Sequence, residues 1–331
     1  MSIEARAGTL DRLGYGTPHH DVYANRARWA GLGAGKAAVV TGANSGLGFF
    51  TSLALAESGA HVVLACRNEA KAEVAMKEIQ RRVPHAKLEY LPFEASSLES
   101  ATALGSILRH RELDILVANA GMIRTPATRV AGSLGYESTM STNFLGHARL
   151  VGELAENFRS RPMRLIGLGS VSTLLLKTDP NNLALDHGYH AYRAYAQSKA
   201  AVQAFTLAMD HRLKQLSWPS RAIAVHPGYS ISGLTLPVPG INEPPYFKRV
   251  RDQMQASFAQ GKHEGSVSLV EAALNPGIPA SPRGIYLGPR FLSKGESSLA
   301  RPAKVTRQKR LMDPVWKIFI EANGGMDPFK I

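Results

Sequence analysis

Short apolar runs rich in β-branched residues alternate with longer amphipathic segments from Lys36 onward. This alternation is typical of βαβ units, in which helices connect parallel strands. We predict helices that include residues 49–58, 69–83 and 192–209, and strands at 37–41, 61–65, 88–93, 115–118, 164–168, 221–226 and 284–287. The sequence therefore predicts an α/β fold with a doubly wound, seven-stranded parallel sheet in a single domain.

Three segments differ in character from this alternation. Residues 1–35 are rich in glycine, arginine and aromatic side chains without clear periodicity, and we interpret them as an N-terminal extension before a domain at 36–290. Residues 229–262 follow a strand end and are rich in proline, glycine and aromatic residues. They form either a lid over a ligand or an ordinary surface excursion. Residues 291–331 form a basic C-terminal extension.

The first predicted strand leads into a glycine-rich turn and then a helix. Gly42, Gly46 and Gly48 allow a tight turn and a close approach of the backbone to a pyrophosphate at a helix N-terminus, which predicts a Rossmann-type dinucleotide site. The second strand leads to Arg67, at a place where an acid would bind a free ribose 2′-hydroxyl. A guanidinium suits a 2′-phosphate, so NADP(H) is favoured over NAD(H), with Glu69 nearby as a competing acid.

Tyr195 and Lys199 lie four residues apart in a predicted helix, so the two side chains share one face. A free phenol has a pKa of about 10. A nearby ammonium is expected to lower this pKa toward the range that is useful for proton transfer. Most such pairs are only an aromatic side chain beside a solvated charge, so the pair gains its meaning from its surroundings.

These features together resemble the classical short-chain dehydrogenase/reductase family over residues 36–287. The spacing from Ser170 to Tyr195 and the sequence at 65–68 are similar to the retinol-dehydrogenase-like branch and its soluble bacterial relatives. The resemblance implies a Rossmann fold that binds a nicotinamide dinucleotide. The matching positions are Gly42, Asn44, Ser45, Gly46, Leu47, Gly48, Asn119, Ala120, Gly121, Asn143, Ser170, Tyr195, Lys199, Pro227 and Gly228.

The resemblance also implies a catalytic role for four of these residues. Tyr195 would exchange a proton with the substrate oxygen, and Ser170 would hydrogen-bond the same oxygen. Lys199 would lower the pKa of Tyr195 and bind the ribose, and Asn143 would position a water that connects the lysine to solvent. Ser172 is a rival for the serine role, because both serines would face the same side if the strand continued.

The cofactor contacts that the resemblance implies lie along the carboxyl edge of the sheet. Arg67, Asn68 and Glu94 would lie on the adenosine side, where Glu94 occupies a place at which the family usually has aspartate. Asn119, Ala120 and Gly121 would follow the fourth strand on the same side, while the turn at 227–228 would face the nicotinamide. Tyr195 and Lys199 would contact both cofactor and substrate.

The net charge of +13 raises the question of an anionic partner. Part of this excess lies in the C-terminal extension, at Lys294, Arg301, Lys304, Arg307, Lys309 and Arg310. Aromatic residues are not interleaved with these charges, and no nucleic-acid motif accompanies them. We therefore interpret the extension as a solvated basic tail, with docking on a partner or an anionic substrate as the alternative, and expect no nucleic acid to bind.

Other features of the composition limit the location and the cofactors. Cys66 is the only cysteine, which rules out an internal disulfide framework and favours a reducing compartment. It ends an apolar run, so a buried side chain is favoured over a nucleophile. We find no apolar run long enough to span a membrane and no secretory leader, and we expect a cytoplasmic protein. No metal is expected, and a homo-oligomer is open.

The sequence thus predicts an NADP(H)-dependent oxidoreductase that acts on a carbonyl or alcohol group. Leu174, Tyr189, Tyr229 and Leu234 lie near the expected pocket, which favours a mainly apolar small-molecule substrate. The alternative is a non-catalytic redox-sensing or regulatory protein that binds a dinucleotide on the same fold. Epimerisation or dehydration is disfavoured, because extended relatives typically have another glycine spacing.

Overall fold

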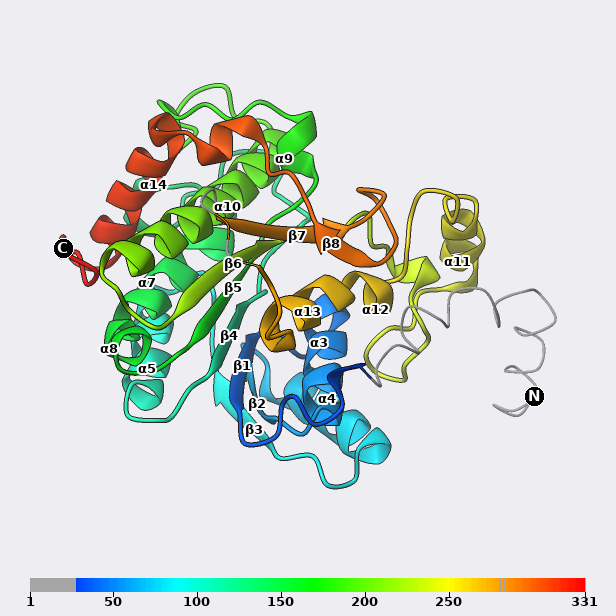
Figure 1. The fold of residues 1–331 in the computed structure, drawn as a ribbon. Helices are drawn as coiled ribbons and strands as arrows, with labels where there is room; N and C mark the ends of the chain where they lie inside the picture. The colour runs from blue at the N-terminus through cyan, green and yellow to red at the C-terminus, as the bar shows by residue number, and fades with distance from the viewer. Residues whose placement is uncertain (1–27, 280, 282–283, 331) are drawn as a thin grey trace.

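A computed structural model describes residues 28–279, 281 and 284–330. Its centre is a sheet of eight strands in the order β3-β2-β1-β4-β5-β6-β7-β8 (Figure 1). The predicted extension at 1–35 therefore lies mostly outside the described residues. The strands are β1 (Ala37–Thr41), β2 (His61–Cys66), β3 (Leu88–Pro92), β4 (Ile115–Ala118), β5 (Arg164–Leu168), β6 (Arg221–Val225), β7 (Ile285–Pro289) and β8 (Ser297–Leu299).

All seven predicted strands are confirmed, and every pairing among them is parallel. The eighth strand, β8, was not predicted and pairs antiparallel with β7. Its three residues are too few to show an alternating pattern, so only the pairing with β7 identifies it as a strand. The fold is a doubly wound Rossmann-type α/β sheet with a short antiparallel edge.

Helices cover both faces of the sheet (Figure 1). One layer contains α3, α4 and α13, and the other contains α5, α7, α10 and α14. The helices are α3 (Gly46–Glu57), α4 (Glu69–Arg82), α5 (Leu98–Leu108), α6 (Ser138–Met140), α7 (Gly146–Glu153), α8 (Ala155–Ser160), α9 (Ser172–Leu175), α10 (Ala191–Gln215), α11 (Tyr246–Gln253), α12 (Lys262–Gly265), α13 (Val267–Leu274) and α14 (Lys309–Ala322). Short 3₁₀ turns occupy Ser133–Gly135, Ser232–Leu234 and Lys304–Arg307, and a π turn occupies Ser141–Leu145.

The two cores follow from the alternation of side chains along each strand. In β1, Val39 packs into the core beneath α5, α7 and α10, whereas Ala38 and Val40 pack into the core beneath α3, α4 and α13. All three side chains are fully buried. A strand buried on both faces has a continuous apolar sequence, which is why the seven long strands were visible in the pattern of residues.

The strand order reverses between β1 and β4, since the chain runs outward from β1 to β3 and then crosses back to β4. Loops at the carboxyl ends of β1 and β4 consequently leave the sheet in opposite directions. In open α/β sheets, the crevice between such loops is where ligands bind.

The C-terminal extension packs against the domain. Leu311, Val315, Ile318 and Phe319 of α14 are buried in the core that α10 also lines, while the six basic side chains noted above are exposed or half-buried. The prediction of a solvated tail is therefore wrong for the described part of this segment. Its apolar residues recur at helical spacing, and this signal was overlooked beside the charge.

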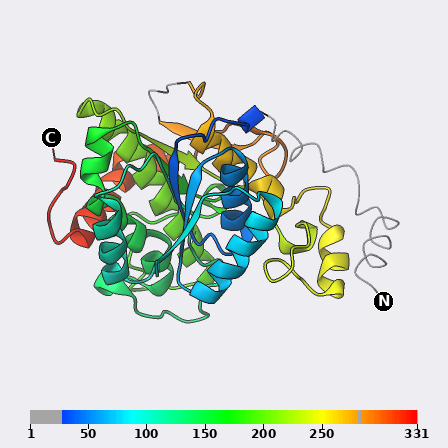
Figure 2. The same ribbon diagram turned by 90° about the horizontal axis from the view of Figure 1, so that it is seen from below.

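The segment at 229–262 carries α11 and extends beside α12, away from the main body of the molecule (Figures 1 and 2). It is tied down at both ends, because the Ile231 amide donates to the Gln260 carbonyl at 2.9 Å and the Gln260 amide donates to the Tyr229 carbonyl at 2.9 Å. Among the described helices, none is both long and apolar enough to cross a membrane.

Candidate functional site

The glycine-rich turn joins β1 to α3. Gly42 and Gly46 have φ angles of +65° and +58°, in the left-handed region that favours glycine. A methyl group on Gly48 would lie 2.4 Å from the Gly42 carbonyl oxygen, so only glycine fits there. The side chain of Ser45 does not cap α3. The first-turn amides of α3 thus face outward without an intrahelical acceptor, and they fit a pyrophosphate.

Thr41 holds the turn to the loop that follows β4. Its Oγ1 accepts hydrogen bonds from the Asn119 and Ala120 amides, both at 2.9 Å, and the Asn119 side-chain amide donates to the Thr41 carbonyl at 2.7 Å. His147 Nε2 lies 2.9 Å from the same Thr41 hydroxyl. Sequence reasoning did not identify Thr41 or His147. A polar residue that ends an apolar strand was the available signal for Thr41.

Cys66 lies beneath the glycine-rich turn. The backbone amides of Ala43 and Asn44 hydrogen-bond its sulfur, and burial raises the pKa of the thiol to about 11. A thiol that stays protonated near neutral pH is a poor nucleophile. The structure thus favours the packing role that the sequence indicated.

The predicted adenosine-side residues lie at the edge formed by β2 and β3. Arg67 is 76% exposed, and its guanidinium lies 3.4 Å from the Glu94 carboxylate. Asn68 has a structural partner, because its side chain caps α4 by accepting from the Lys71 amide at 2.9 Å. Glu94 also accepts from the Ser96 hydroxyl at 3.0 Å. Arg67 is therefore the accessible cation at this edge, and Asn68 is held as a helix cap.

Ser170 and Tyr195 meet beyond the carboxyl end of β5. Ser170 hydrogen-bonds the phenol of Tyr195, which lowers the pKa of the phenol, but burial has the larger effect and the pKa is raised. Ser172 does not replace Ser170, since its hydroxyl donates to Ser170 Oγ at 3.0 Å and its amide at 3.2 Å. Ser170 is thus the serine in contact with the tyrosine, and Ser172 supports it.

Lys199 is 5% exposed, and its Nζ donates to the Leu168 carbonyl at 2.8 Å. Burial lowers the pKa of Lys199 to about 8. The expectation that Lys199 lowers the pKa of Tyr195 is wrong for this arrangement, because the amine is directed at a strand carbonyl and burial dominates both groups.

Asn143 lies in the π turn and connects two parts of the site. Its Oδ1 accepts from the Met122 amide at 2.7 Å, and its Nδ2 donates to the Met122 carbonyl at 3.2 Å and to Ser198 Oγ at 2.9 Å. A side chain on Gly121 would collide with Asn143 at 2.7 Å. Asn143 thereby joins the loop after β4 to the helix that carries Tyr195.

The predicted nicotinamide-side turn follows β6. Gly228 has a φ angle of +66°, and a methyl group there would lie 2.3 Å from the Ser293 carbonyl oxygen. The Pro227 carbonyl accepts from Ser230 Oγ at 2.7 Å and from Gln260 Nε2 at 2.8 Å. The turn is thus fixed to the end of the 229–262 segment.

The structure therefore brings most of the predicted residues to one edge of the sheet. Asn44, Ser45 and Leu47 lie in the glycine-rich turn, and Ala120 packs against Gly42. Within the described residues, no group of three or more histidine, cysteine or acidic side chains could hold a metal ion. The arrangement combines an anion-binding turn with a hydrogen-bonded hydroxyl pair and a buried amine.

Known proteins share both the sequence pattern and the fold. A family model described as short chain dehydrogenase matches residues 36–237. Retinol dehydrogenase 11 of Homo sapiens is 36% identical over 197 residues, which cover 59% of this chain and 61% of the human protein. Retinol dehydrogenase 13 of Mus musculus is 35% identical over 198 residues, which cover 59% of this chain and 58% of the mouse protein. The chain thus spans about three-fifths of the length of these curated relatives.

Solved structures show the same architecture. An uncharacterized protein from Mycobacterium paratuberculosis has a TM-score of 0.69 at 26% identity, with 88% of this chain and 94% of that chain covered. An NAD(P)-dependent gluconate 5-dehydrogenase from Beutenbergia cavernae has a TM-score of 0.55 at 23% identity, with 73% and 90% covered. The second likeness concerns the fold alone.

Proposed function

This chain belongs to the short-chain dehydrogenase family, and we propose that it is an NADP(H)-dependent oxidoreductase acting on a mainly apolar small molecule. It would interconvert a carbonyl and an alcohol by hydride transfer. The observation that carries this proposal is the hydrogen-bonded pair of Ser170 and Tyr195 beside the buried amine of Lys199. This group lies at the same edge of the sheet as the glycine-rich turn.

The residues that would hold the cofactor follow the carboxyl edge of the sheet. The amides at the start of α3 would bind the pyrophosphate, while Asn119 and Gly121 border the adenosine half and Gly228 borders the nicotinamide half. The nicotinamide, when bound, supplies or accepts the hydride. The close packing around Gly48 and Gly228 supports a site in which the backbone itself contacts the ligand.

Proton transfer is the task of this chain's own residues. In the reductive direction, Tyr195 Oη donates its proton to the substrate oxygen, and Ser170 Oγ hydrogen-bonds the same oxygen. The raised pKa of Tyr195 keeps the phenol protonated near neutral pH, which supports the role of acid. Lys199, with a pKa of about 8, exchanges protons near neutrality and is suited to restore the phenol. We assign the side chain of Asn143 to positioning, because its polar atoms bind Met122 and Ser198.

Arg67 supports a preference for NADP(H). Its guanidinium is highly exposed, and its contact with Glu94 is long at 3.4 Å. An exposed ion pair contributes little to stability, so a 2′-phosphate is able to displace Glu94 from the guanidinium. A phosphate binds arginine with two parallel hydrogen bonds. Glu94 would disfavour the phosphate to some extent, which makes the preference a matter of degree.

Apolar side chains around the hydroxyl pair support an apolar substrate. Leu174 and Leu175 on α9 directly follow the serine loop and are 41% and 77% exposed. Tyr229, at the start of the proposed lid, is 40% exposed and stacks on Phe258 with ring centroids 6.1 Å apart. Tyr189 donates its hydroxyl to the Pro126 carbonyl at 2.9 Å, which leaves its ring as the available surface. Leu234 is half-buried.

A substrate screen tests the proposed function. Purified protein is mixed with NADPH or NADH and a panel of apolar ketones and aldehydes, and oxidation of the cofactor is followed by absorbance. We expect turnover of at least one apolar carbonyl compound, faster with NADPH. A protein that binds neither nucleotide, or that binds NADPH and turns over no member of the panel or of a matching alcohol panel, contradicts the proposal.

A further inference from the structure

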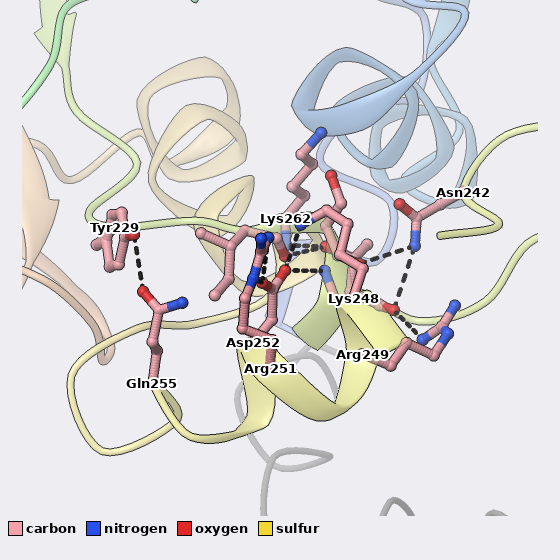
Figure 3. A network of polar contacts seen from close by, with 12 residues as sticks. Tyr229, Asn242, Lys248, Arg249, Arg251, Asp252, Gln255 and Lys262 are labelled. Atoms are coloured by element: carbon pink, nitrogen blue, oxygen red, sulfur yellow. Dashed lines mark hydrogen bonds and ion pairs between the residues drawn. The ribbon is translucent and has the colours of Figure 1, made fainter. Parts of the chain in front are cut away.

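Lys262 lies over the glycine-rich turn, although it is more than 200 residues away in the chain. A methyl group placed on Gly46 would lie 3.4 Å from Lys262 Nζ and 3.5 Å from its Cδ. Figure 3 shows the Lys262 side chain extending from the lid segment toward α3. The amine is thus held at the start of α3, where the proposed pyrophosphate site lies.

Within the described part of the chain, Lys262 has no carboxylate partner. The nearby Lys248 pairs with Asp252, which also accepts from Arg251 and from the Gly233 amide (Figure 3). That carboxylate is therefore already surrounded by donors. Burial and the charge of Lys248 both lower the pKa of Lys262. Two ammonium groups close together at a helix N-terminus favour an anion between them and the helix.

The position of Lys262 is fixed by its backbone. The Lys262 amide donates to Thr235 Oγ1 at 2.8 Å. Gly261 and residues 263–270 are buried, so Lys262 is the residue in this stretch that reaches the surface. Gly265, one turn later, packs so tightly that a methyl group there would lie 2.9 Å from the Pro227 carbonyl oxygen and 3.1 Å from Leu47 Cδ2. Helix α12 is consequently wedged between the turn after β6 and α3.

We propose that Lys262 binds the pyrophosphate of the dinucleotide and closes the lid segment over it. This inference rests on the proposed function, since it adds a lysine to the same cofactor site. The amine would face the first-turn amides of α3 across the phosphates, so the anion would be held from both sides. Because α12 directly follows the lid segment at 229–262, binding of the phosphates would also hold that segment in place.

Titration of Lys262→Gln with NADPH and NADH tests this contact without any substrate. We expect the Kd to rise about tenfold for both nucleotides, as for the loss of one hydrogen bond to a charged group. Lys262→Arg should retain most of the affinity. Arg67→Gln is the matched comparison, because it should weaken NADPH and leave NADH nearly unchanged. Lys304→Gln, on an exposed lysine of the C-terminal segment, should change neither.

The possible outcomes separate this inference from the proposed function. Equal weakening of both nucleotides supports the pyrophosphate contact. Unchanged binding overturns it, and weakening of NADPH alone overturns it by placing the amine at the 2′-phosphate. Thermal unfolding without nucleotide controls for folding, and Lys262→Met repeats the test if the glutamine variant unfolds early. A wild-type protein that binds neither nucleotide overturns the proposed function, and this inference with it.

Discussion

Thr41 and Asn143 show how single residues build this site. Each is buried, and each directs its polar atoms at the backbone of the loop after β4. Their hydrogen bonds keep that loop beside the glycine-rich turn and beside the helix of Tyr195. Buried polar groups are stable only when they are hydrogen-bonded, so such contacts hold the loops in one arrangement.

Replacement of Tyr195 by phenylalanine tests the proposed acid. Tyr195→Phe should lower kcat by about 10²- to 10⁴-fold, the usual contribution of a general acid. Binding of NADPH should be nearly unchanged, because the ring stays in place. Tyr192→Phe, on the same helix and 73% exposed, is the control and should retain full activity. Rates and nucleotide titrations of both variants measure the effect. Substantial turnover by Tyr195→Phe would exclude the phenol as the proton donor.

The buried His147 predicts a loss of stability in acid. Burial lowers the pKa of His147 to about 4, whereas the pKa of an unfolded histidine is about 6.5. The unfolded state therefore binds more protons between these values, so the stabilisation is complete above about pH 6.5 and is lost as pH falls toward 4. From pH 7 to pH 5, this one residue should cost about 2 kcal/mol.

Urea unfolding at both pH values measures this effect. His147→Gln should be less stable at pH 7, because it changes the contact with Thr41, but its stability should fall less between pH 7 and pH 5. His110→Gln removes an exposed histidine and should keep the wild-type pH dependence. Identical slopes for wild type and His147→Gln would contradict the lowered pKa.

Two irregular elements position the chemistry. The π turn at Ser141–Leu145 contains Asn143, and the glycine-rich turn begins α3 without a side-chain cap. Neither element is an efficient piece of regular structure. π turns are often found at functional sites, and an uncapped helix N-terminus keeps its amides available for a ligand. In both elements, local regularity is lost where a ligand would bind.

Gly48→Ala should damage the cofactor site. Its methyl group would meet the Gly42 carbonyl oxygen and the Asn119 side chain, at 2.4 and 2.5 Å. We expect a loss of about 1–3 kcal/mol of stability from overpacking, together with a large rise in the Kd for NADPH. Gly31→Ala is the control, because Gly31 has a positive φ but open space around it. It should lose some stability through strain and keep NADPH affinity. Calorimetric titration measures both, and tight binding by Gly48→Ala would contradict the described packing.

At the scale of the whole molecule, the C-terminal segment supports the catalytic helix from behind. Phe319 of α14 packs on Phe205 of α10 with ring centroids 5.0 Å apart, and Gln203 Nε2 donates to Thr306 Oγ1 at 2.9 Å. Helix α10 also carries Tyr195 and Lys199. The position of the catalytic side chains thus depends on residues more than 100 positions later in the chain.

Phe319→Ala should destabilise the protein by about 3–5 kcal/mol, as for a large aromatic side chain removed from a core. Met326→Ala, at a 71% exposed position in the same segment, should change stability by less than about 0.5 kcal/mol. Urea unfolding of both variants measures the difference. A solvated tail would make the two variants equal, which is the result that would contradict the packing of α14.

The parts of the site that could be predicted are those encoded by neighbouring residues. The glycine spacing around Gly42 and the pair of Tyr195 and Lys199 depend on one turn and one helix, so both were visible in the sequence. Lys262 and His147 act across contacts between distant segments, and no local pattern marks them. The pKa of Tyr195 was predicted in the wrong direction, because burial is a property of the folded chain.

The sequence by itself determined the seven parallel strands, the phosphate-binding turn and the family, since alternating burial and backbone freedom impose residue types at short spacing. The tertiary structure decided where each side chain is directed. It placed the amine of Lys199 on the Leu168 carbonyl and that of Lys262 over Gly46, and it packed α14 against α10. These contacts depend on how distant segments pack in three dimensions, and the order of residues along the chain does not contain them in any local form.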